Sequence, residues 1–147
     1  SDGIMQVFDD VTADEDLWAA FQEETSEHFT KVIEAFTVLE QGEDPDALKT
    51  LRRSVHQLKG ASGVIGMLNT SRVNAQMQKI LDRIFEGEGQ WSAGLLPLFQ
   101  AAFDIVLESV GGRGTGAGLR DRAAAVQESF DRIQAGAEVP AQPAIAQ

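Results

Sequence analysis

Residues 56–63 read HQLKGASG, and this stretch holds the side chains best suited to chemistry in the chain. His56 is followed one helical turn later by Lys59, and then by Gly60 and Gly63. A neutral imidazole nitrogen is a competent nucleophile, and a nearby ammonium can bind the oxygens of an incoming phosphoryl group. Glycines without side chains would let another protein lie close to the ring. The pattern therefore points to phosphoryl transfer onto His56.

A helix is predicted to carry this stretch. Apolar residues recur every three or four positions across residues 48–65, and an N-cap and a first-turn proline precede them, Asp44 and Pro45. At 100° per residue, His56 lies beside the apolar stripe and faces outward, whereas Ser62 falls on the buried stripe. Further cations share the outward face with His56: Lys49, Arg52 and Arg53. We expect them to orient an acidic partner.

Hydrophobic spacing is helical almost throughout the chain, and no convincing strand with a period of two is present. We expect five helices. The first runs from a capping box at Thr12 and Glu15 to Gly42, the second from Asp44 to Gly66, and the third from a cap at Asn69 or Thr70 to Gly87 and Gly89. The fourth runs from about Leu95 through Pro97 to Val110, and the fifth from Leu119 to Ile133. Short links favour antiparallel neighbours. The predicted fold class is all-α: an antiparallel four-helix bundle with an additional fifth C-terminal helix.

The predicted organisation has five parts: an N-terminal segment at 1–13, the bundle at 14–110, a Gly-rich connector at 111–118, the fifth helix at 119–135 and a flexible linker at 136–147. The connector, GGRGTGAG, superficially resembles a phosphate-binding loop. No strand precedes it and the Lys-Ser/Thr pair is missing, so a flexible connector is preferred. The tail is rich in Ala, Pro and Gln, which is typical of a linker to a further part of a longer protein.

Composition limits the classes of function. The chain has 147 residues, a hydrophobic fraction of 43%, a net charge of −11 and no cysteine. These values argue against a disordered chain, nucleic-acid binding and direct membrane insertion, and they favour a cytoplasmic location. Neither histidine, His28 or His56, has a glutamate three residues before it, so no metal site is expected.

HQLKGASG resembles the His-x-x-Lys-Gly-x-Ser core of histidine phosphotransfer (HPt) domains. The preceding LKTLRRSV resembles the approach to that core in the P1 domain of CheA-type chemotaxis kinases, and the likeness extends over roughly residues 14–135. The resemblance implies that His56 accepts a phosphoryl group from ATP through a separate kinase domain and passes it to an aspartate of a CheY-like response regulator. It also implies that this domain binds no cofactor itself, because Mg²⁺ belongs to the receiver and ATP to the kinase domain.

The resemblance assigns roles to two further residues. Lys59 would stabilise the attached phosphoryl group. CheA-type domains commonly place a glutamate on the third helix to bind the other ring nitrogen, and alignment on Ile80-Leu81-Asp82 puts Gln78 there. An amide can fix the tautomer of the ring, but it favours a positive ring less than a carboxylate would. We therefore expect weaker activation of His56 and an unusual phosphodonor, such as a kinase domain on another polypeptide.

Simpler interpretations of these residues remain open. The stretch at 56–60 is also compatible with a solvated helix face, and Gly60 and Gly63 with close helix packing. The cations before His56 would then serve only solubility, while His28 is expected to be structural. Two other functions compete with a kinase-borne P1 domain: a free-standing phosphorelay protein, and a non-catalytic helical adaptor that binds a response regulator. No independent nucleotide fold is visible, so an ATP site within this domain is not expected.

Overall fold

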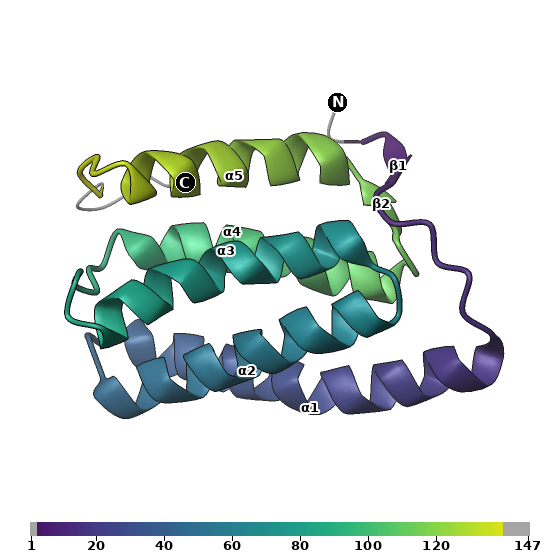
Figure 1. The fold of residues 1–147 in the computed structure, drawn as a ribbon, viewed down its shortest axis with the longest axis horizontal. Coiled ribbons are helices and arrows are strands. Elements are labelled where there is room, and N and C mark those ends of the chain that lie inside the picture. Colours follow the sequence, from purple (N-terminus) through teal and green to yellow (C-terminus); the bar gives the residue numbers. More distant parts are fainter. Residues whose placement is uncertain (1–2, 140–147) are drawn as a thin grey trace.

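The structure, a computed structural model, describes residues 3–139. Its helices are α1 (Glu15–Leu39), α2 (Pro45–Val64), α3 (Leu68–Phe85), α4 (Leu95–Gly111) and α5 (Leu119–Gln134). Figure 1 shows α1 to α4 as an antiparallel bundle with α5 lying along α3 and α4. The predicted fold class is confirmed. Most of the linker expected at 136–147 lies outside the described residues.

All five helices contribute to one core. Edge-to-face contacts join Phe36 to Phe103, Trp91 to Phe99, and Phe99 to Phe130, with ring centroids 5.3 to 5.8 Å apart. Because Phe130 belongs to α5, this helix shares the bundle's core instead of standing apart from it. None of the helices in residues 3–139 combines the length and the apolarity needed to cross a bilayer.

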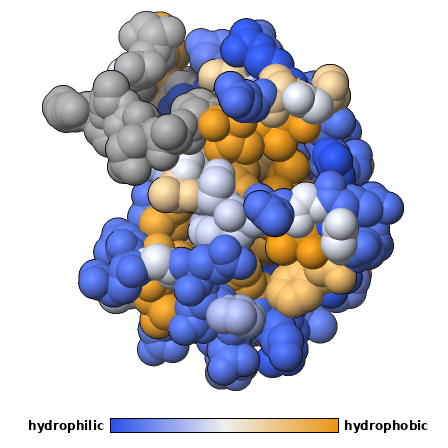
Figure 2. All heavy atoms as spheres, turned by 90° about the vertical axis from the view of Figure 1, so that its left-hand side faces the viewer, coloured by the Kyte–Doolittle hydropathy of each residue, from blue (hydrophilic) through white to orange (hydrophobic). Residues whose placement is uncertain are grey.

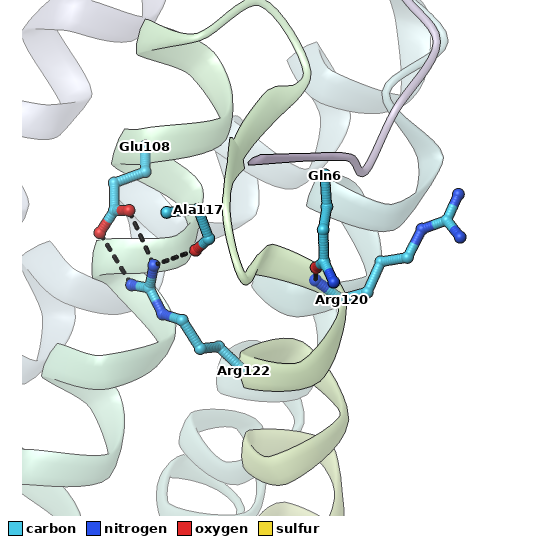
Figure 3. A network of polar contacts seen from close by, with 5 residues as sticks. All are labelled: Gln6, Glu108, Ala117, Arg120 and Arg122. Carbon is cyan, nitrogen blue, oxygen red and sulfur yellow. Dashed lines mark hydrogen bonds and ion pairs between the residues drawn. The ribbon is translucent and has the colours of Figure 1, made fainter. Parts of the chain in front are cut away.

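A small sheet closes one end of the bundle, and the sequence did not predict it. Strand β1 (Met5–Val7) pairs antiparallel with β2 (Thr115–Ala117), with Gln6 opposite Gly116. Figure 3 shows the polar contacts beside it: Gln6 Oε1 accepts from the backbone N–H of Arg120 at 2.8 Å, and Arg122 donates to both carboxylate oxygens of Glu108. Strands of three residues are too short to show a period of two, so no local pattern indicated them.

The Gly-rich segment is packed tightly, which corrects the prediction of a flexible connector. A Cβ at Gly112 would lie 1.9 Å from the carbonyl oxygen of Thr115. A Cβ at Gly114, where φ is +91°, would lie 2.0 Å from the carbonyl oxygen of Asp9. Only glycine fits either position, because the backbone approaches too closely for any side chain. These glycines allow the backbone segments beside the β1–β2 pair to approach each other closely.

The helix N-termini are capped partly as predicted. Asp44 caps α2 by accepting from the N–H of Ala47 at 2.9 Å, which confirms the expected cap. Asp14, not Thr12, caps α1. The predicted caps of α3 are wrong, because this helix begins at Leu68 and its N–H groups at residues 69 and 70 donate to buried Asp9, at 2.8 and 2.9 Å. The cap of α3 therefore comes from the N-terminal segment.

Candidate functional site

His56 stands on the outer surface of α2. The positions predicted to be apolar on this helix are buried, among them Leu51, Val55 and Leu58, and Ser62 is buried with them. Burying that stripe turns His56, which lies beside it, outward, and its side chain is exposed. The imidazole is therefore accessible to another protein.

Gln78 of α3 holds one side of the ring. Its Oε1 lies 3.3 Å from Nδ1 of His56, and its side chain is half-buried. An amide oxygen only accepts hydrogen bonds, so the tautomer that can donate across this contact is the one with its proton on Nδ1. Nε2 then carries the lone pair. The structure thus brings together the two residues that the sequence placed on different helices.

Two hollows of different character flank His56. The hollow between α2 and α3 has a volume of about 520 Å³ and is lined by Lys49, Arg52, Arg53, His56, Gln78, Asp82 and Phe85. The hollow between α1 and α2 has a volume of about 350 Å³, and most of its lining is apolar: Leu17, Ala20, Phe21, Glu24, His56, Gln57, Gly60, Ala61, Val64 and Ile65. The ring of His56 borders both. We call them the basic hollow and the apolar hollow.

Arg52 is held in place by α3. Its Nε donates to Oδ1 of Asp82 at 2.8 Å, and its guanidinium carbon lies 4.9 Å from the centroid of the Phe85 ring. The sequence indicated Arg52 as a surface cation but missed both partners. In the sequence, Asp82 served only to align the third helix with CheA-type domains. No local sequence pattern connects Asp82 with Arg52, which lies 30 positions earlier. Arg52 is therefore a positioned cation rather than a mobile one.

Lys59, Gly60 and Gly63, which follow His56 on α2, have different neighbours. Lys59 is exposed one turn beyond the ring, and its carbonyl oxygen accepts from Ser71 Oγ at 2.9 Å. A Cβ at Gly60 would meet nothing within 4 Å, so this glycine leaves the apolar hollow open. Gly63 faces α3 instead, where a Cβ would lie 3.6 Å from Ser71 Oγ. The two glycines thus lie one turn apart on α2 but have different surroundings.

Other candidate positions do not join this site. His28 on α1 is half-buried, and its Nδ1 has no hydrogen-bond partner in the described part of the chain. Among residues 3–139, no group of three or more His, Cys, Asp or Glu side chains is arranged to hold a metal ion. Two acidic residues on α4, away from His56, have shifted pKa values. Burial raises the pKa of Asp104, and hydrogen bonds from Arg122 lower the pKa of Glu108.

Comparisons with known proteins agree with this geometry. The family model of the Hpt domain matches residues 16–136. Among solved structures, the phosphorylated P1 domain of CheA3 from R. sphaeroides, crystallised in complex with CheY6, has a similar fold with a TM-score of 0.66. The sequences are 18% identical, and the match covers 80% of this chain and 97% of that one. Because the family match spans most of the chain, this chain belongs to the Hpt family, the histidine phosphotransfer domains, as the residues around His56 predicted.

Proposed function

We propose that His56 accepts a phosphoryl group derived from ATP and passes it to an aspartate of a CheY-like response regulator. The observation that carries this proposal is the exposed ring whose Nδ1 contacts Gln78 Oε1 at 3.3 Å. A fixed tautomer directs the Nε2 lone pair at solvent, where a donor and then a receiver can reach it. The domain contributes a positioned nucleophile, and its partners contribute the remaining catalytic groups.

In this proposal, Lys59 binds oxygens of the phosphoryl group once it is attached to His56. An ammonium on a flexible stem suits this role, because it can follow the group as it moves. Gln78 accepts from Nδ1–H and so stabilises the positively charged phosphorylated ring. ATP is bound by the histidine kinase catalytic domain and Mg²⁺ by the receiver, and this domain binds neither. The kinase domain uses cytoplasmic ATP, so we place this domain in the cytoplasm.

The apolar hollow is the surface that suits the receiver. Leu17 and Val64 border it with 51% and 86% of their surface exposed. Exposed apolar side chains beside a reactive group are typical of a protein interface. Gly60 adds no side chain that would keep a partner away from the ring. The complex of CheA3 P1 with CheY6 supports a response regulator as the partner.

A kinase-borne P1 domain is preferred to a free-standing relay protein, because the likeness to CheA-type domains is found both around His56 and in the fold. A non-catalytic adaptor is the competing class. An adaptor would bind the receiver through the same apolar surface without ever carrying phosphate. The two differ in whether His56 becomes phosphorylated, and this can be measured directly.

The test is phosphorylation by a CheA-type kinase catalytic domain with labelled Mg·ATP. Wild-type protein should gain an acid-labile, base-stable label, and His56→Gln should gain none while still binding a CheY-like receiver. His28→Gln is the matched control and should keep the label, because His28 lies outside the site. An adaptor would bind the receiver equally well with or without His56 and would never be labelled.

A further inference from the structure

The basic hollow has a charge opposite to that of the molecule. The chain carries a net charge of −11, yet three cations and a single carboxylate line this hollow: Lys49, Arg52, Arg53 and Asp82. Within residues 3–139, neither Lys49 nor Arg53 forms an ion pair. Charges that are not neutralised locally attract an anion of matching shape. The hollow therefore fits an anionic ligand next to His56.

The cations lie on the N-terminal side of His56 along α2. Arg53, Arg52 and Lys49 precede His56 by three, four and seven residues, which corresponds to about 5 to 10 Å along the axis of α2. Cations spread over this length suit a chain of several phosphates better than a single phosphoryl group. The receiver brings a free aspartate carboxylate, with its charge already balanced by Mg²⁺. Only the donor brings a polyphosphate.

Of the three cations, Arg52 is the one whose side chain is held in position by its neighbours. Asp82 and Phe85 fix its guanidinium, and in the described part of the chain only its Nε takes part in a hydrogen bond. The Nη groups keep donors that can bind phosphate oxygens in a fork. Phe85, 36% exposed, is the last residue of α3. This end of α3 lies on the left of Figure 1, the side that faces the viewer in Figure 2, where hydrophobic residues lie among hydrophilic ones.

We propose that the basic hollow is the donor side of His56: it receives the phosphate chain of a nucleoside triphosphate held by the kinase domain, while the receiver uses the apolar hollow. This inference rests on the proposed function. Nε2 of His56 attacks the terminal phosphorus, the N–P bond forms as the bond to the bridging oxygen breaks, and the nucleoside diphosphate leaves with that electron pair. The Nδ1 proton stays on the ring, bound to Gln78 Oε1, so no proton transfer is required.

The experiment measures the two half-reactions separately. The first is phosphorylation by a CheA-type kinase catalytic domain with Mg·ATP. The second is transfer to a CheY-like receiver from protein already phosphorylated with phosphoramidate, a small donor that needs no docking. Lys49→Gln/Arg53→Gln should lower kcat/KM of the first reaction about fivefold for each cation removed, and less at high salt. The second reaction and the reaction with phosphoramidate should change by less than about twofold, because neither uses these cations.

Two controls complete the design. Lys31→Gln/Arg132→Gln removes the same charge from α1 and α5 and should leave both half-reactions unchanged. Val64→Ser on the apolar hollow should slow transfer to the receiver and leave the donor reaction unchanged. The inference is overturned if the basic variant slows both half-reactions equally, slows neither, or behaves like the charge control. Wild-type protein that accepts phosphate from no donor would instead overturn the proposed function itself, and the inference with it.

Discussion

Gln78 is the side chain of the neighbouring helix that contacts the ring of His56. Its amide occupies the position where the sequence comparison expected a carboxylate, and it contacts His56 from the neighbouring helix at 3.3 Å. An amide fixes the tautomer without adding charge. A carboxylate would also stabilise the positive ring that forms when phosphate is attached. In the proposed function, the residue at position 78 therefore tunes the reactivity of His56.

Gln78→Ala should lower the rate of phosphorylation of His56 about three- to tenfold, since one hydrogen bond contributes about 1 kcal/mol. Gln78→Glu should raise the rate above that of the wild type. Initial rates of label incorporation with the same kinase domain measure both. Gln127→Ala, on the exposed face of α5, is the matched control and should have no effect. Equal rates for wild type and Gln78→Ala would contradict the role given to the amide.

The glycines differ in what a side chain would meet. Gly114→Ala places a Cβ 2.0 Å from the carbonyl oxygen of Asp9, in a backbone conformation with φ of +91°. It should lower the free energy of unfolding by more than about 2 kcal/mol. Gly60→Ala, in the interior of α2 with open space around it, should raise the free energy of unfolding by up to about 1 kcal/mol. Urea denaturation followed by circular dichroism distinguishes the two effects, and similar effects of both substitutions would be inconsistent with this packing.

At the level of elements, α3 depends on the N-terminal segment. Asp9 accepts from the N–H groups of Asn69 and Thr70 and from the Thr70 hydroxyl, the last at 2.6 Å, and Thr70 Oγ1 lies 2.7 Å from Ser109 Oγ. A carboxylate at a helix N-terminus also interacts favourably with the helix dipole. Because α3 carries Gln78, the segment before α1 supports the helix that orients His56.

Asp9→Ala should lower the free energy of unfolding by about 2 kcal/mol or more, since a helix cap and a charged hydrogen bond are lost together. Hydrogen exchange at the Asn69 and Thr70 amides should accelerate more than exchange at the middle of α2. Asp10→Ala, at the exposed neighbouring position, serves as the control and should have little effect. Unchanged protection of these two amides would show that α3 is stable without the cap.

At the scale of the whole molecule, pH acts through two acids on α4 in opposite directions. Hydrogen bonds from Arg122 lower the pKa of Glu108 below 4.5, so this pair stabilises the fold above pH 4.5 and the contribution is lost as pH falls through the lowered pKa. Burial, followed by repulsion from Glu108, raises the pKa of Asp104 above 3.8. Ionised Asp104 therefore destabilises the fold at neutral pH, and protonation removes this effect.

Arg122→Gln should be less stable than the wild type at neutral pH, and the difference should shrink as pH falls below 4.5. The pKa of Glu108 should rise in this variant, as an NMR titration of its carboxyl group would show. A stability difference that stays constant down to the lowest accessible pH would refute the linkage.

Asp104→Asn should be more stable than the wild type at neutral pH, because it removes a partly buried charge. The advantage should disappear as pH falls through the raised pKa of Asp104 towards 3.8, where the wild type takes up the proton. Parallel urea titrations at several pH values measure the effect. An advantage that grows on acidification would have the wrong sign for this mechanism.

The local sequence pattern determined the helices and the outward position of His56. The spacing of apolar residues at three and four positions predicted the five helices, and the same spacing on α2 turned His56 outward, because helical periodicity is a property of neighbouring residues. The Asp44 cap was also predictable, since it bonds to a residue three positions away. The motif around His56 was sufficient to indicate the family.

Only the tertiary structure decided which distant residues meet. The β1–β2 pair, the Asp9 cap on α3 and the pairing of Arg52 with Asp82 join residues 30 or more positions apart in the sequence. Neither hollow beside His56 could be predicted, because each is formed by two helices whose relative rotation depends on the packing of the whole core. The sequence by itself therefore determined the helix of His56 and the outward direction of its ring, whereas tertiary packing decided the ring's partner and the surfaces on either side of it.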